Sequence, residues 1–248
     1  MTKWISNDRE VLESIPQSER AASVVDLALD EIPVERTLGI HWNVGADKFC
    51  FKFVAKEKPL TRRGVLSFAS SPYDPLGFPF NLLPNMILQE LCKKKLGWDE
   101  RIDGEELKRW KDWLADLPRL LEIVVSGCFK TLGFGDFVRV QLHHFFDASR
   151  GAYGTASYLR LVDVHGNMHC SFIIRKSRLA PLRSITIPRL ELSVAVMSVK
   201  MDHMLQRELD LPLVEGIFWC DSTSVIQLIR NMSKRFHTNH SESSLGYP

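Results

Sequence analysis

The stretch from Val138 to Lys176 constrains the fold more than any other part of the chain. In its first part, every second residue shares one face of an extended chain: Val138, Val140, Leu142, His144 and Phe146. Short turns at 149–152 and 163–167 separate this run from two further extended runs, Tyr153–Val162 and Met168–Lys176. Consecutive strands joined by short turns predict a three-stranded antiparallel meander.

A long amphipathic helix is predicted directly after the meander. It opens at Pro188, a residue type favoured in the first helical turn, and ends before Pro212. Its apolar stripe has helical spacing: Leu190, Val194, Met197, Met201, Met204 and Leu205. The apolar run Val214–Cys220 then predicts a buried strand that ends at Asp221, and Ser222–Met232 predicts another helix. The strand, helix, strand order predicts a parallel crossover added to the meander, so the fold class is α/β.

The residues before the meander show different patterns, and we expect an α+β N-terminal part. Residues 20–29 can form only a short helix, and alternating apolar residues on both sides of 43–47 predict a hairpin. Three prolines and a glycine within 70–79 predict a loop. Helical spacing then predicts two helices, one after Pro84 and one from an N-cap at Asp103 to Pro118.

The composition is typical of a folded intracellular domain. The 248 residues are 45% apolar, and the net charge of +2 is too small to indicate a nucleic-acid-binding protein by itself. The five cysteines include no C-x-x-C pair, which argues against a disulfide framework and a thiolate zinc site. No run approaches the ~20 apolar residues of a spanning helix, and the first residues lack the apolar core of a signal peptide. We therefore expect an intracellular, most simply cytoplasmic, protein with no membrane partner.

Three acids fall where the predicted topology would bring them together. Asp147 ends the first strand, Glu191 lies in the first turn of the long helix, and Asp221 ends the parallel strand. In α/β sheets, ligands bind at the carboxyl ends of central strands. Carboxylates there can hold two Mg²⁺ ions that activate a water and stabilise the leaving oxygen of a cleaved phosphodiester. Taken singly, each acid also fits a structural role, since Asp is common in turns and Glu complements the helix dipole.

The motifs around these acids form an ordered set. They are Phe146-Asp-Ala-Ser149, Lys176–Pro181, Thr186–Leu192 and Phe218–Ser222, preceded by Thr37–Asn43 and Tyr73–Phe78. The set resembles Pol polyproteins of Bel/Pao-type LTR retrotransposons: the later motifs resemble their ribonuclease H region, and the two early ones resemble the segment after the polymerase active site. The resemblance covers almost the whole chain.

The resemblance implies a fold and a function. The fold is a ribonuclease H-like mixed sheet with three antiparallel strands and a parallel crossover. Asp147, Glu191 and Asp221 match the family's catalytic and metal-binding acids. The implied cofactor is Mg²⁺ in a two-metal site, the reaction is hydrolysis of RNA in RNA/DNA hybrids, and the partners are that hybrid and the remainder of a Pol polyprotein.

The resemblance also divides the chain. Residues 1–60 match the end of a reverse transcriptase palm, 61–133 a thumb and connection, and 134–238 an incomplete ribonuclease H-like domain. Residues 239–248 diverge from the family, which continues instead into an Asn-Arg-Val helix and a fourth acid. We therefore expect a disordered tail, a fold truncated at the C-terminus, and cleavage that is weak or lost. The polymerase aspartates are not in this sequence, so polymerase activity is not implied.

Five basic residues near the start of the long helix are candidates for binding nucleic-acid phosphates. They are Arg175, Lys176, Arg178, Arg183 and Arg189. A solvated basic face is the alternative. Neighbouring His143 and His144 cannot form one site, because successive residues of a strand point to opposite faces.

Two other functions stay open. One is a non-catalytic nucleic-acid-binding remnant of an element. The other is an aspartic-type peptidase, because the family is catalogued as a Pao retrotransposon peptidase. Against the second, the triplets at Asp147 and Asp221 lack the glycine that each tight turn of an aspartic dyad needs.

Overall fold

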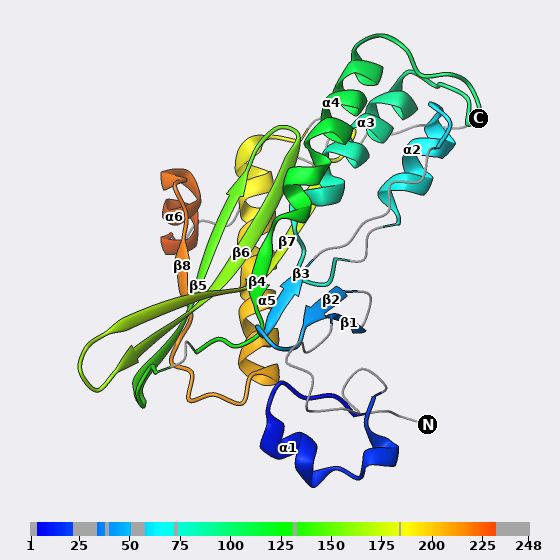
Figure 1. Cartoon of the computed structure of the whole chain (residues 1–248). Coiled ribbons are helices and arrows are strands. Elements are labelled where there is room, and N and C mark those ends of the chain that lie inside the picture. The colour runs from blue at the N-terminus through cyan, green and yellow to red at the C-terminus, as the bar shows by residue number, and fades with distance from the viewer. Residues whose placement is uncertain are drawn as a thin grey trace, which may run out of the picture.

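The structure is a computed structural model, and it describes residues 4–21, 34–37, 40–50, 58–71, 74–130, 133–183 and 185–231. Two sheets and a unit of three helices make up most of it (Figure 1). The predicted short helix at 20–29 and the predicted unstructured end at 236–248 lie almost wholly outside the described residues. Within the described residues, no helix is long and apolar enough to cross a membrane.

The smaller sheet has the strand order β1-β2-β3-β4, and all its pairs are antiparallel. Its strands are β1 Val34–Thr37, β2 Ile40–Asn43, β3 Lys48–Cys50 and β4 Val124–Ser126. The β2–β3 pair confirms the predicted hairpin in the described range, with Trp42 directly opposite Phe49. A short helix, α1 (Arg9–Ser14), and a 3₁₀ turn, η1 (Gln17–Glu19), precede this sheet.

The helical unit has its own apolar core. It contains α2 Arg62–Ala69, the 3₁₀ turn η3 Pro79–Asn81, α3 Leu82–Lys93 and α4 Gly104–Leu121. Phe68 packs edge-on against Trp110 and Trp113, whose rings stack with centroids 5.1 Å apart. The prediction that Pro118 ends α4 was wrong. A proline removes its own N–H donor and its ring crowds the carbonyl four residues earlier, but Pro118 lies in the last turn, so the disturbance falls where the helix ends at Leu121.

The larger sheet has the order β7-β6-β5-β8 and confirms the predicted mixed α/β fold. Its strands are β5 Phe137–Ala148, β6 Ala152–Asp163, β7 Met168–Leu179 and β8 Ile217–Trp219. The first three form the antiparallel meander, and β8 pairs in parallel with β5. Helix α5 (Ile187–Glu208) makes the crossover between β7 and β8, and α6 (Thr223–Arg230) follows β8.

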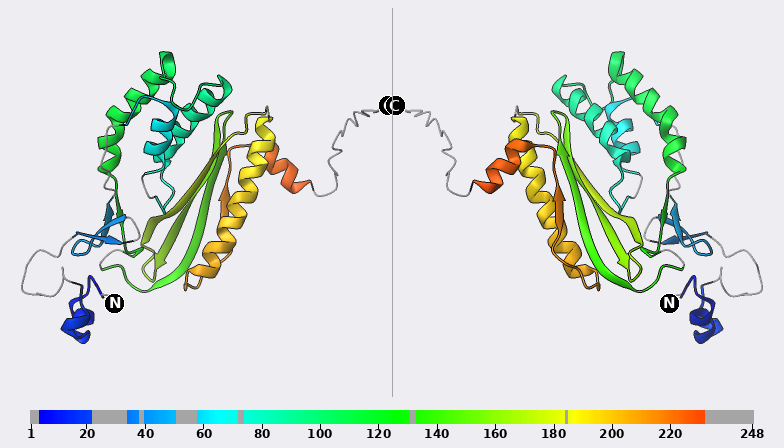
Figure 2. Two further views of the ribbon diagram at one scale, coloured as in Figure 1. Left: turned by 90° about the vertical axis from the view of Figure 1, so that its right-hand side faces the viewer. Right: turned by 90° about the vertical axis from the view of Figure 1, so that its left-hand side faces the viewer.

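Helix α5 covers one face of the larger sheet, while the helical unit and the smaller sheet stand on the other side (Figures 1 and 2). Leu142 and Leu159 of the sheet pack with Met201 and Leu205 of α5 in one core cluster. The predicted apolar stripe of α5 is therefore confirmed. Strand β8 differs from the prediction of a buried strand, because Phe218 and Trp219 are exposed at the edge of the described sheet.

The loop before α3 ties the helical unit to β7. The backbone N–H of Arg175 donates to the carbonyl of Leu76 at 2.8 Å, and the Gln89 side-chain amide of α3 donates to the carbonyl of Ala180 at 2.8 Å. Gly77 permits this approach, because its φ is +77° and a Cβ atom there would lie 1.7 Å from the Arg175 carbonyl oxygen. The described part, 74–79, confirms the predicted loop up to the 3₁₀ turn at Pro79.

Candidate active site

The parallel pairing of β5 with β8 brings Asp147 and Asp221 to the same end of the sheet. The Cα partners are His143 with Ile217, His144 with Phe218 and Phe145 with Trp219. Asp147 and Asp221 continue this register with the same sequence separation, one near the end of β5 and one just after β8. Both carboxylates are exposed and line one cavity of about 650 Å³. The sequence prediction placed these two acids at one end of neighbouring strands, and the structure does so.

Glu191 reaches the same end of the sheet from α5. The Ser222 hydroxyl donates to Glu191 Oε2 at 2.7 Å, and Ser222 directly follows Asp221. The prediction that Glu191 lies in the first turn was wrong, since α5 begins at Ile187 and has no acid in its first turn. A second-turn position lies further from the helix terminus, which weakens the purely structural explanation that Glu191 serves the helix dipole.

Ser222 is a site residue that the sequence prediction missed. Its Oγ atom also accepts from the backbone N–H of Val225 at 3.3 Å, so it caps α6 at its N-terminus. One side chain thus fixes the start of α6 and the position of Glu191. The sequence signal for Ser222 was its position between a strand-end acid and a helix, which is typical of an N-cap. The contact with Glu191 had no such signal, because the two residues are 31 positions apart in the chain.

The Cys220 thiol shows how closely the three acids gather. Burial raises the pKa of Cys220, and the negative charges of Asp221, Glu191 and Asp147 raise it further. All three carboxylates therefore lie within electrostatic reach of one atom. The backbone N–H of Ser222 donates to the Cys220 sulfur at 3.2 Å, which opposes this rise in part.

The acids fit Mg²⁺ in their chemistry more than in their spacing. Carboxylate oxygens are the ligands that Mg²⁺ prefers, and two of the three side chains are exposed. Yet across the described ranges no three His, Cys, Asp or Glu side chains come close enough to hold one metal ion. Asp147 Oδ1 instead accepts from the backbone N–H of Ala148 at 2.6 Å, and Glu191 binds Ser222. The carboxylates are gathered without converging on one point.

The five predicted phosphate-binding residues do not form one patch. Arg175 lines the cavity of the acids, whereas Lys176 and Arg178 line a second cavity of about 530 Å³ against α5. The alternation of side chains along β7 accounts for this division. Arg183 lies in the turn before α5 and Arg189 at its start, and both are exposed.

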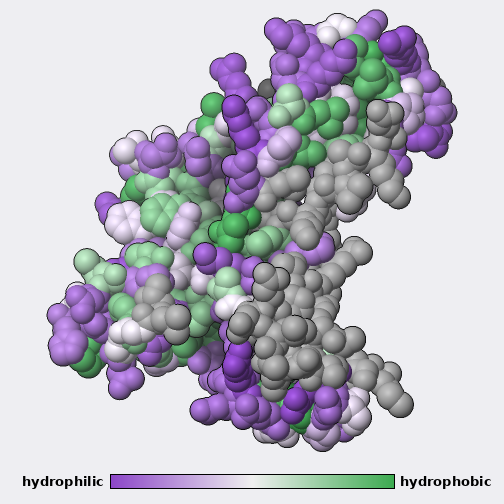
Figure 3. Space-filling model, in the orientation of Figure 1, coloured by the Kyte–Doolittle hydropathy of each residue, from purple (hydrophilic) through white to green (hydrophobic). Residues whose placement is uncertain are grey.

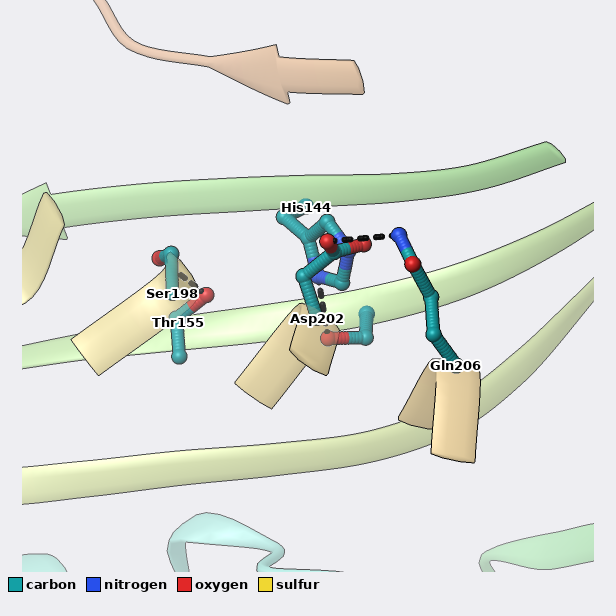
Figure 4. A network of polar contacts seen from close by, with 6 residues as sticks. His144, Thr155, Ser198, Asp202 and Gln206 are labelled. Atoms are coloured by element: carbon teal, nitrogen blue, oxygen red, sulfur yellow. Dashed lines mark hydrogen bonds and ion pairs between the residues drawn. The ribbon is translucent and has the colours of Figure 1, made fainter. Parts of the chain in front are cut away.

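A buried polar network connects β5, β6 and α5 (Figure 4). His144 Nε2 lies 2.9 Å from Asp202 Oδ1, and His144 Nδ1 lies 2.8 Å from Ser157 Oγ. The Gln206 side-chain amide donates to Asp202 Oδ2 at 2.8 Å, which satisfies the second carboxylate oxygen. A carboxylate only accepts, so Nε2 carries the imidazole proton and Nδ1 accepts the Ser157 hydroxyl.

The buried network contains the three residue types of a nucleophilic triad, in Ser157, His144 and Asp202, but a substrate cannot reach them. His144 and Ser157 are both fully buried, so no substrate could reach the serine oxygen. Burial lowers the pKa of His144, although Asp202 opposes this in part. The network is a structural one that connects two of the elements carrying acids, and the His144 ring also stacks on Phe218 of β8 with centroids 5.0 Å apart.

The larger sheet thus combines three antiparallel strands with one parallel strand reached through a helix, and it carries acids at the ends of the two parallel strands, as predicted for a ribonuclease H-like domain. A family model described as "Pao retrotransposon-like RNaseH-like domain" matches residues 61–222, well over half of the chain. The chain therefore belongs to this family, which confirms the predicted relation to Pao-type retrotransposons.

The comparisons with individual proteins are more distant. No curated protein matches the chain. A solved structure titled "Structure of the foamy viral protease-reverse transcriptase dRH in complex with ds DNA" matches with 14% sequence identity and a TM-score of 0.38. That match covers 79% of this chain and 32% of the other, so the present chain spans about a third of that protein's length.

Proposed function

We propose that this domain hydrolyses RNA in RNA/DNA hybrids and that Asp147, Glu191 and Asp221 are its catalytic acids. The observation that supports this most directly is that Asp147, near the end of β5, and Asp221, just after the adjacent parallel strand β8, line one cavity. When bound there, Mg²⁺ would activate a water and stabilise the leaving oxygen of the cleaved phosphodiester. Within this proposal the hybrid is the substrate and the rest of a Pol polyprotein is the natural context of the domain.

The residues of the chain have distinct roles in this proposal. Asp147 and Asp221 present negative charge to the cavity, and Ser222 keeps Glu191 beside them. Arg175 lines the same cavity and would bind a substrate phosphate. Because the three carboxylates do not converge on one point, we expect weak metal binding and slow cleavage.

The test is cleavage of a hybrid whose RNA strand carries a 5′ label. We expect slow cleavage in Mg²⁺, none in chelator, and none by Asp147→Asn or Asp221→Asn, because each change removes a carboxylate charge. Asp112→Asn is the matched control, since Asp112 is exposed on α4, away from the acids, and should leave cleavage unchanged.

The alternative functions predict different results in assays of hybrid binding, hybrid cleavage and peptide cleavage. Binding of the hybrid that weakens steeply with salt, without any cleavage, would favour a non-catalytic nucleic-acid-binding protein. Cleavage that survives Asp147→Asn would contradict the site. Chelator-insensitive cleavage of a peptide at acidic pH would contradict the nuclease and favour an aspartic peptidase.

A further inference from the structure

The face of the larger sheet opposite α5 carries a group of aromatic rings, which we call the aromatic face. Its members are His143, Phe145, Tyr158, Phe172 and Trp219. In Figure 3, which looks onto this side, pale and green residues gather over the strands. Phe145, Tyr158 and Trp219 are 47%, 37% and 49% exposed, and large exposed aromatic groups mark binding surfaces more often than single apolar residues do.

Three rings of the aromatic face, those of His143, Phe145 and Trp219, are nearly parallel, whereas the Tyr158 ring stands edge-on to Phe145 at 88°. The Trp219 Nε1–H donates to His143 Nδ1 at 3.0 Å, and the two ring planes differ by only 13°. This hydrogen bond holds the Trp219 ring in place beside His143. The Phe145 ring is within 8° of the Trp219 plane, with centroids 5.9 Å apart.

Three cavities that share lining residues, which together we call the groove, lie along the aromatic face and reach the candidate active site. The cavity of about 650 Å³ that holds Asp147 and Asp221 is also lined by Phe145 and Trp219. A second cavity of about 520 Å³, lined by His143 and Tyr158, shares Phe145 with the first. A third, of about 570 Å³, shares Tyr158 with the second and extends past Phe172 to β4.

The charges along this groove are complementary to phosphates. Arg175 lines the first and third cavities, and Arg160, whose guanidinium donates to Gln141, lines the second. Within the described residues, the side chains that line the second cavity include no acid. The groove therefore has aromatic rings along its length, guanidinium groups beside them, and acids at one end only.

We propose that this groove binds a single-stranded segment of nucleic acid, with unpaired bases stacked on Phe145, Tyr158 and Trp219. This inference rests on the proposed function, because the bound strand would lead to Asp147 and Asp221. Aromatic side chains stack with any base, and arginines beside them bind the backbone. A duplex does not fit this chemistry, since its bases stack on each other and expose no free ring faces. The ligand is thus a single strand.

The first experiment compares two fluorescent single-stranded oligonucleotides of equal length, one with bases and one abasic. Both carry the same phosphates, so only stacking separates their affinities. Measured by anisotropy with the wild-type chain, the abasic strand should bind more weakly by roughly 5- to 150-fold per stacked base that is lost. Equal binding of the two strands would overturn the proposal without any variant being needed.

The second experiment assigns the stacking to the aromatic face. Phe145→Leu and Trp219→Leu keep apolar side chains but remove the flat rings, and each should weaken binding of the strand with bases while leaving abasic binding unchanged. Val199→Ala is the matched control, because Val199 is 41% exposed on α5, the opposite side of the sheet. Unchanged binding by both leucine variants would overturn the proposal, and circular dichroism checks that each variant is folded.

These results are separable from the proposed function. Asp147→Asn should abolish hybrid cleavage without weakening single-strand binding, whereas the leucine variants weaken binding whether or not cleavage is seen. If the face instead binds protein, the two strands bind alike and the leucine variants change the oligomeric state in sedimentation, which overturns the proposal. If cleavage fails but stacking holds, the groove is a binding site and only the nuclease assignment is lost.

Discussion

His144 Nε2 and Asp202 Oδ1 lie 2.9 Å apart, with the two side chains only 0% and 7% exposed. His144 belongs to the strand that carries Asp147, and Asp202 to the helix that carries Glu191. The hydrogen bond therefore connects two of the elements that hold the candidate acids. It satisfies an imidazole donor and a carboxylate that would otherwise be costly to bury.

The titration of His144 should make the fold less stable in acid. Burial lowers the pKa of His144 in the folded chain, so below the unfolded value of about 6.5 the unfolded chain binds more protons than the folded one. The contribution of His144 to the free energy of unfolding is then fully present above about pH 6.5. It is lost as the pH drops toward the lowered pKa of His144 in the folded chain. Urea unfolding followed between pH 8 and pH 5 measures this loss.

Two variants test the origin of that pH dependence. His144→Gln should unfold more easily at every pH but lose part of the dependence, because it removes the titrating group. His203→Gln is the control, since His203 is exposed on the same helix as Asp202. A dependence that is identical in His144→Gln and the wild type would show that His144 is not its source.

Position 216 should not accept a residue larger than glycine without a loss of stability. A Cβ atom there would lie 2.2 Å from Asp202 Oδ1, so Gly216→Ala must displace the carboxylate that holds His144. We expect a loss of about 1–3 kcal/mol in the free energy of unfolding, as for other overpacked sites. Gly135→Ala, whose nearest atom would be 4.0 Å away, should change stability little. Equal thermal midpoints for the two variants would contradict this contact.

Ser222→Ala should lower both stability and hybrid cleavage. Loss of the cap of α6 costs about 1 kcal/mol, and loss of the contact at 2.7 Å frees Glu191 from the other acids. Thr61→Ala is the control, because Thr61 caps α2 in the same way but lies in the helical unit. The two variants should be destabilised alike, and only Ser222→Ala should cleave more slowly in Mg²⁺.

Two apolar residues of β5 should differ greatly in their contribution to stability, because the strand has a register irregularity at Val138, which leaves this side chain exposed. Leu142 is 0% exposed, and Leu142→Ala should cost about 2–5 kcal/mol because it leaves a cavity under α5. Val138 is 66% exposed, so Val138→Ala should stay within about 0.5 kcal/mol of the wild type. Chemical denaturation of both variants measures the difference, and similar losses would contradict the described packing.

Periodicity predicted the larger sheet well, because one face of β5 is buried along most of its length. Alternation at Val140, Leu142 and His144 is enough to define that face, and short turns fix the antiparallel partners. The position of Asp147 beside Asp221 followed from the same topology. Strand β8 was predicted to be buried because its residues are apolar, but its position at the edge of the described sheet is set by tertiary structure, which hydropathy does not report.

The polar contacts of the site could not be predicted from patterns. The bonds of Glu191 with Ser222 and of His144 with Asp202 join residues 31 and 58 positions apart, and neither pair has a characteristic local spacing. The division of the basic residues between two faces follows from strand alternation at Arg175 and Lys176, once β7 is known to include both.

The pairing of β5 with β8 has a consequence for how the site forms and is lost. The meander β5–β7 can form from local hairpins, whereas β8 joins through Cα pairs whose members are 74 residues apart, as for His143 and Ile217. Closing so long a loop carries an entropic cost that only completed packing of α5 repays. Asp147 and Asp221 should therefore meet last during folding and separate first in partial opening, so that hydrogen exchange at β8 reports the fraction of molecules with an assembled site.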